Sequence, residues 1–115
     1  MQRIVIITLL MACSNFSHAK NTKAENEQSC RGLMSAATMA MESRQGGTSL
    51  ESMLIAIDSV KSKGEMSKPA SEAFRQILID AYDQPTYASS EYRQKAINDF
   101  AAKYYVKCMK GYGLN

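Results

Sequence analysis

Cysteines are the residues of this 115-residue chain best suited to covalent chemistry. Cys30 and Cys108 lie near the two ends of the chain that follows residue 19, and Cys13 precedes that point. An even pair of cysteines in an oxidising compartment is typical of a disulfide. Buried free thiols and zinc ligands are the alternatives, but after residue 19 no histidine and no third cysteine could complete a zinc site. The sequence therefore predicts a Cys30–Cys108 disulfide and no bound metal.

Groups that could catalyse a reaction are scarce. The single histidine, His18, lies in the first nineteen residues, so the rest of the chain lacks the commonest general base. No glycine-rich phosphate loop and no nucleophile elbow are present. Asp80 and Asp83 are spaced to share a helix face, which would suit a small carboxylate-dependent hydrolase, although a solvated face near a helix end explains them more simply. We expect no catalytic residue and no cofactor.

The last predicted helix carries a candidate partner-binding face. On the side away from its apolar stripe, Tyr92 shares a helix face with three lysines: Lys95, Lys103 and Lys107. A tyrosine on a charged face is a common interface anchor, and neighbouring lysines can steer an acidic partner. The alternative is a singly exposed aromatic residue among lysines that keep the surface soluble. Three apolar residues that fall off their stripes would mark another binding patch if they converged: Met39, Ile55 and Ile79.

Residues 1–19 have the composition of an export signal. A basic start is followed by an apolar run and then by small residues at both ends of a tripeptide, in residues 1–3, 4–12 and 17–19. A membrane-spanning helix needs about 20 apolar residues, so this run is too short for one. We predict cleavage after Ala19 and a periplasmic or secreted product without a transmembrane span. The alternative is a lipoprotein cut before a lipidated Cys13, because residues 10–13 resemble a lipoprotein cleavage box.

Helical spacing of apolar residues recurs in four segments after residue 28. The first segment ends at Gln45, because Gly46 and Gly47 stop a helix readily. The second opens at a capping box formed by Thr48 and Glu51. The stripes are Cys30, Leu33, Met34, Ala37 and Met41 in the first segment, and Leu50, Met53, Leu54 and Ile57 in the second.

The two later segments are bounded by prolines and serines. The third has Pro69 in its first turn and ends before Pro85. The fourth is capped by Ser89 or Ser90 and runs to about Lys110. The stripes are Ala70, Ala73, Phe74, Ile77, Leu78 and Ala81 in the third segment, and Ile97, Phe100, Ala101, Tyr104 and Cys108 in the fourth.

These segments predict an all-α fold, a small bundle of about four helices in one domain of residues 20–115, with residues 20–28 flexible. Short loops favour side-by-side packing of consecutive helices. Both cysteines lie on apolar stripes, so the disulfide is predicted to join the first and last helices. The 14 basic and 11 acidic residues are interleaved and no base-reading motif appears, so no nucleic-acid binding is expected. The oligomeric state is left open.

Short motifs are spread over about three quarters of the chain that follows residue 19. They are Met41-Glu42-Ser43-Arg44-Gln45-Gly46, Ala81-Tyr82, Pro85-Thr86-Tyr87, Asp99-Phe100, and Tyr105 with Cys108. In these motifs the chain resembles a group of small exported helical proteins of proteobacteria and their phages, which carry one cysteine near each end. The resemblance implies origin and architecture, and it transfers no activity and no functional residue.

Size, export, the disulfide and the missing catalytic groups together favour a non-catalytic periplasmic protein that binds another protein of the cell envelope. An envelope inhibitor, an immunity factor or a phage-encoded exclusion factor would fit. A small periplasmic acid-stress chaperone is the first alternative, because protonation of carboxylates could loosen the domain and expose its methionine-rich faces. The small hydrolase based on carboxylates is the second.

Overall fold

The computed structural model describes residues 22–113, so the predicted signal segment 1–19, with its cleavage site and Cys13, lies outside the described residues. The described chain forms four helices: α1 (Lys23–Gln45), α2 (Leu50–Ser62), α3 (Lys68–Tyr82) and α4 (Ser90–Gly111). No strand occurs between residues 22 and 113. The predicted all-α fold of four helices is confirmed.

Each helix begins after a hydroxyl residue whose side chain accepts a hydrogen bond from a backbone amide of the first turn. These caps are Thr22, Ser49, Ser67 and Ser89. Ser89 was one of the two predicted caps of α4, whereas the capping box predicted at Thr48 is wrong. The Thr48 amide donates to the Ser43 carbonyl at 3.1 Å and completes the C-terminal turn of α1 around Gly47, whose φ is 83°. Ser49 is therefore the residue that caps α2.

Helix α1 begins earlier than its apolar stripe suggests. The sequence predicts a flexible segment at 20–28, whereas residues 23–28 form the first turns of α1. The Thr22 hydroxyl accepts a hydrogen bond from the Glu25 amide at 3.2 Å. One turn further on, the Arg31 guanidinium donates to the Glu27 carboxylate at 2.9 Å. Capping and charge pairing therefore extend the helix beyond its apolar residues.

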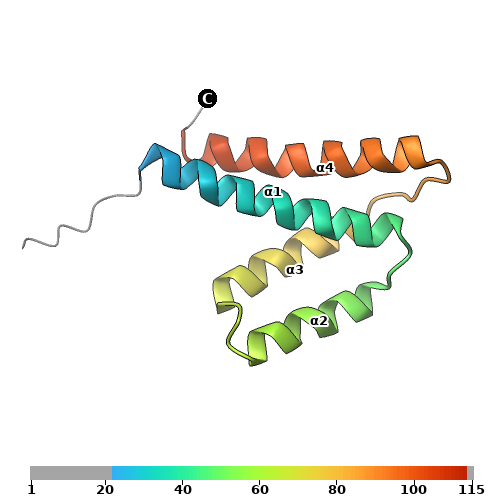
Figure 1. Ribbon diagram of the computed structural model, residues 1–115, viewed down its shortest axis with the longest axis horizontal. Helices are drawn as coiled ribbons and strands as arrows, with labels where there is room; N and C mark the ends of the chain where they lie inside the picture. Colours follow the sequence, from blue (N-terminus) through green and yellow to red (C-terminus); the bar gives the residue numbers. More distant parts are fainter. Residues whose placement is uncertain (1–21, 114–115) are drawn as a thin grey trace, which may run out of the picture.

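Helices α1 and α4 lie side by side and run in opposite directions (Figure 1). Helix α3 packs against α1, and α2 packs mainly against α3. The prediction that consecutive helices pack side by side therefore holds extensively only for α2 and α3. The segment 83–89 carries the chain from α3 across the end of α1 to the start of α4 (Figure 1). This crossing places α1 between α4 and α3.

The hydrophobic core lies between α1, α3 and α4. It consists of Ala37, Ala40, Met41, Ile57, Ile77, Leu78, Ala81, Ile97, Phe100 and Ala101. Helix α2 contributes only Ile57 to this cluster. The predicted stripe of α3 is buried only in part: Ile77, Leu78 and Ala81 are in the core, whereas Ala70 and Ala73 are exposed. The first half of α3 therefore presents apolar side chains to a surface.

The predicted Cys30–Cys108 disulfide is present and joins α1 to α4. The two Cα atoms are 5.4 Å apart, and Cys30 is fully buried. One turn before Cys30, the Glu27 carboxylate also accepts a hydrogen bond from the Tyr105 hydroxyl of α4 at 3.3 Å. The covalent bond and this hydrogen bond fasten the start of α1 to the end of α4.

Candidate functional site

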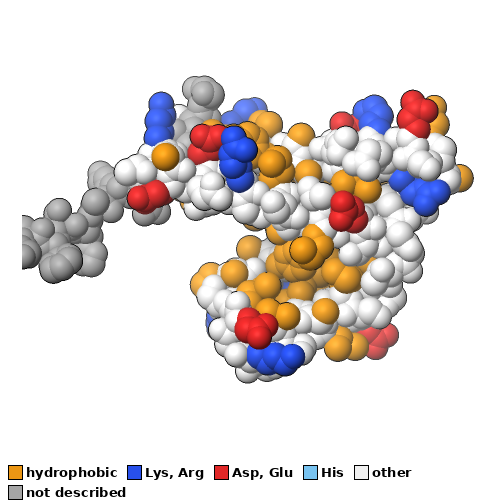
Figure 2. All heavy atoms as spheres, viewed as in Figure 1, with side chains coloured by type: hydrophobic (Ala, Val, Ile, Leu, Met, Phe, Trp, Pro, Cys, Tyr) orange, Lys and Arg blue, Asp and Glu red, His pale blue; other side chains and the backbone are white. Residues whose placement is uncertain are grey.

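An apolar groove separates α1 from α2, and α3 forms its floor. Figure 2 shows hydrophobic side chains gathered in this hollow. Its main part encloses about 400 Å³, and a second part toward the start of α3 encloses about 260 Å³. We call it the α1–α2 groove, and its larger lining residues include Met39 on α1, Met53, Ile57 and Val60 on α2, and Met66 and Phe74 on the α3 side.

Small side chains keep the α1–α2 groove open. Helix α1 presents Gly32 and Ala36 to it, α2 presents Ala56, and α3 presents Ala70 and Ala73. A Cβ atom at Gly32 would meet no neighbouring atom within 4 Å. Because these positions carry little bulk, the facing helices do not interdigitate, and the space between them is left unfilled.

The lining of the groove carries no charged residue among those that the structure describes. Its polar side chains are two serines, and the hydroxyl of one of them, Ser29, already donates to the Glu25 carbonyl at 3.1 Å. Met39 is 54% exposed at the edge of the groove, and Met53 and Met66 also line it. Methionine side chains are flexible and adapt to irregular apolar surfaces. The groove is therefore suited to an apolar face rather than to a charged ligand.

The three off-stripe apolar residues do not line the same hollow. Met39 lines the α1–α2 groove. Ile79 lines a different hollow between α2, α3 and α4. Ile55 is 61% exposed on α2 and lines neither of them. These three residues therefore do not line one common hollow, and of the three only Met39 lines the apolar α1–α2 groove.

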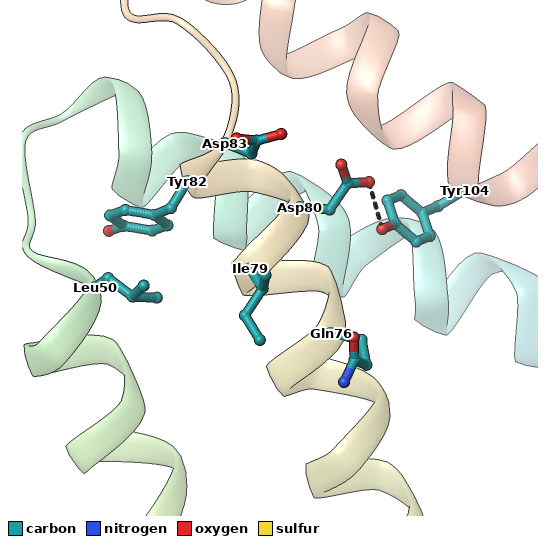
Figure 3. Close-up of a pocket in the computed structure, with 7 residues that line it drawn as sticks. All are labelled: Leu50, Gln76, Ile79, Asp80, Tyr82, Asp83 and Tyr104. Atoms are coloured by element: carbon teal, nitrogen blue, oxygen red, sulfur yellow. Dashed lines mark hydrogen bonds between the residues drawn. The ribbon is translucent and has the colours of Figure 1, made fainter.

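The hollow between α2, α3 and α4 is more polar than the groove (Figure 3). Both aspartates singled out in the sequence, Asp80 and Asp83, line it. The Asp80 carboxylate accepts hydrogen bonds from the Tyr104 hydroxyl at 2.6 Å and from the Lys103 ammonium at 3.1 Å. The bond from Tyr104, followed by the bond and charge of Lys103, holds the pKa of Asp80 below its ordinary value.

This arrangement does not resemble an acid–base pair. A carboxylic acid that donates a proton at neutral pH needs a raised pKa, and such pairs are recognised by environments that push two pKa values apart. The pKa of Asp80 is instead lowered, and its oxygens are occupied by Tyr104, Lys103 and the Gln84 amide. The hydrogen bonds of Asp80 connect α3 to α4, which is a structural role.

The predicted partner-binding residues of α4 are all exposed: Tyr92, Lys95, Lys103 and Lys107. The ring of Tyr92 lies 6.4 Å from that of Tyr87, which the sequence did not connect with it. Two of the lysines pair with carboxylates, in Lys95–Asp99 and Lys103–Asp80. These pairs offset part of the positive charge that was expected to attract an acidic partner.

The end of α1 holds the crossing segment with two side chains. The buried Gln45 amide donates to the Pro85 carbonyl at 2.8 Å and accepts from the Tyr87 amide at 3.0 Å. The Arg44 guanidinium donates to the Gln84 carbonyl at 3.0 Å and lies 5.6 Å from the centre of the Tyr82 ring. Three of the motifs that carry the resemblance therefore meet at one place, where they fix the path from α3 to α4.

No helix between residues 22 and 113 is both long and apolar enough to cross a membrane. Within the same residues, no group of three or more histidine, cysteine, aspartate or glutamate side chains is arranged to hold a metal ion. Comparison of the chain with protein-family models, with curated proteins and with solved structures finds no match.

Proposed function

We propose that this chain is a non-catalytic exported protein that binds another protein of the cell envelope through the α1–α2 groove. The observation that carries the proposal is the groove itself, an open apolar surface formed by three helices and lined without charge. Exposed apolar surfaces of this kind mark sites of protein interaction. An inhibitor, an immunity factor or a phage-encoded exclusion factor of the periplasm would act in this way.

The chemistry of the groove favours a helix as the bound segment. An extended peptide would bury backbone amides and carbonyls that need hydrogen-bond partners. The walls are helices whose backbone groups are already paired, and the lining offers only Ser29 and Ser35 as polar side chains. A helix satisfies its own backbone and can present an uncharged apolar face to the uncharged walls. We therefore infer that the partner contributes an amphipathic helix.

Export is supported by two features of the chain. Residues 1–19 have the charged, apolar and small-residue order of a signal sequence. The disulfide between Cys30 and Cys108 is of the kind that persists in an oxidising compartment such as the periplasm. Cleavage after Ala19 releases a periplasmic or secreted domain, and cleavage before Cys13 is the lipoprotein alternative.

A periplasmic acid-stress chaperone is the second candidate, because three methionines line the groove. Methionine-rich surfaces bind many sequences by changing their packing. A chaperone and a specific binding protein would use the same groove but would differ in what occupies it. Many unfolded clients indicate a chaperone, and one folded partner indicates a specific binding protein.

Photocrosslinking from the groove tests the proposal. A photoreactive phenylalanine derivative at position 39 should capture one protein in the periplasm, whereas the same group at position 55 should not, because Ile55 is exposed outside the groove. The Gly32→Leu substitution should abolish capture from position 39 by filling the groove, and it should keep or raise thermal stability because leucine is a better helix former. Equal capture from both positions, or capture that survives in Gly32→Leu, contradicts the proposal.

The exposed face of α4 is the alternative surface for the same function, and Tyr92→Ala separates the two. The ring is 62% exposed, so the substitution should leave folding almost untouched. A partner anchored on α4 would lose a few kcal/mol of binding free energy. A partner seated in the groove would lose none, because no α4 residue lines the groove. Titration of the captured partner with both proteins measures the difference.

A further inference from the structure

Helix α2 is the least anchored of the four helices. Its only extensive helix contact is with α3. Of its thirteen residues, only Ile57 is buried. By contrast, α1 packs against both α3 and α4 and is bonded covalently to α4 through Cys30–Cys108. The structure therefore consists of a well-packed part, made of α1, α3 and α4, and one peripheral helix.

The polar ties of α2 to the rest of the protein are few and lie at the surface. Asp58 pairs with Arg75 of α3 at 2.8 Å, but these side chains are 63% and 39% exposed. Ion pairs at such exposure contribute little to stability. In the turn before α2, the Thr48 carbonyl accepts a hydrogen bond from the Tyr82 hydroxyl. Neither tie spans the groove from α2 to α1.

Both turns that flank α2 contain a glycine with positive φ. Gly47 has a φ of 83° and lies between α1 and α2, and Gly64 has a φ of 74° and follows α2. A Cβ atom at either glycine would meet no neighbouring atom within 4 Å. Glycine has a wider range of backbone conformations than other residues, so both turns can absorb a rotation of the helix between them.

We propose that α2 is a movable wall of the α1–α2 groove, turning about Gly47 and Gly64 while α1, α3 and α4 stay fixed. Its inner face carries Met53, Ile57 and Val60, which line the groove. Movement of α2 toward α1 narrows the groove and buries its apolar lining, and movement away widens it for a bound helix. Movement of α2 controls access to the binding site of the proposed function, and in this respect the inference rests on that proposal. The movement itself takes place in the free protein, without a bound partner.

Hydrogen exchange of the whole disulfide-bonded protein, measured without a partner, tests the inference. Amides of α2 should exchange about 100-fold faster than the buried amides of α1 and α4, and at a rate insensitive to low denaturant. A 13-residue helix that swings out of its contact with α3 is too short to stay helical alone, so its amides open locally during the movement. In Ile57→Ala, exchange in α2 should rise further, by about 30-fold or more, because truncation of a buried isoleucine costs at least about 2 kcal/mol. The matched control is Ile55→Ala, which removes an exposed side chain of the same helix and should leave exchange in α2 unchanged.

Exchange of α2, α1 and α4 at one common, denaturant-sensitive rate would show a single cooperative unit and overturn the inference. An Ile57→Ala protein in which α2 exchanges no faster than in the wild type would do the same. These outcomes are independent of partner capture. A rigid α2 would leave the groove as a binding site, and a mobile α2 without capture from position 39 would reject the proposed function alone.

Discussion

Asp80 on α3 accepts hydrogen bonds from two side chains of α4, Tyr104 and Lys103. The sequence placed this aspartate on a solvated helix face, since its spacing from Asp83 was the only pattern available. The two α4 residues that donate hydrogen bonds to Asp80 and lower its pKa stand 23 and 24 positions further along the chain. Local periodicity carries no information about such a pairing. The structure therefore shows the pairing of Asp80 with α4, which the sequence did not reveal.

The pairing of Asp80 makes a testable contribution to acid stability. Because its pKa is lower in the folded protein, the contribution is complete above the ordinary carboxyl pKa of about 4 and is lost as the pH falls through the lower folded value. Asp80→Asn should lower the free energy of unfolding at pH 7 by about 1 kcal/mol, because a charged acceptor becomes neutral. Denaturant titrations should show that this difference shrinks toward pH 3.

The control for this prediction is Asp83→Asn, at the exposed end of the same helix. It removes the same charge without touching Tyr104 or Lys103. Its free energy of unfolding should stay close to that of the wild type across the pH range. A constant gap between the wild type and Asp80→Asn from pH 7 to pH 3 would show that ionisation of Asp80 does not stabilise the fold.

At the scale of the element, the sequence predicted all four helices because helix ends depend on local signals. It predicted the disulfide because only two cysteines follow residue 19. Caps, glycine pairs and prolines mark helix ends within a few residues, and Ser89 and Gln45 follow those rules. Burial along each stripe was less predictable. Ala70 and Ala73 have the correct spacing for a core but line an open groove. Which stripe is covered depends on where the neighbouring helices lie, and spacing along one helix does not encode that.

The start of α2 allows the corrected cap to be measured. The Ser49 hydroxyl accepts a hydrogen bond from the Ser52 amide at 3.1 Å, so Ser49→Ala should destabilise the protein by about 1 kcal/mol. Thr48→Ala should have a smaller effect, because Thr48 contributes backbone hydrogen bonds that alanine retains. Thermal or chemical denaturation of the two variants compares them directly. A larger loss in Thr48→Ala would restore the capping box predicted from the sequence.

At the scale of the whole molecule, the order of the helices determines whether there is a groove. Short loops predicted that each helix would pack beside the next, which would have closed a bundle. The crossing segment held by Gln45 and Arg44 instead brings α4 to the far side of α1 and leaves α2 in contact mainly with α3. These hydrogen bonds join residues about forty positions apart. The motifs that contain Gln45 and Pro85 can be recognised in the sequence, but the sequence does not show that they contact each other.

The disulfide fastens the pair of helices on which this arrangement is built. Its two cysteines are 78 positions apart, so reduction frees a long loop in the unfolded chain and should lower the free energy of unfolding by about 4–5 kcal/mol in the loop-entropy model. Denaturant titration with and without reductant measures this loss. Cys30→Ala with Cys108→Ala should match the reduced protein, apart from the cavity left by the buried Cys30.

Because α2 makes few contacts with α1 and α4, reduction should lower the stability of α1 and α4 while local opening of α2 keeps its rate. Hydrogen exchange of the reduced protein would contradict this account if α2 accelerated and α1 and α4 did not.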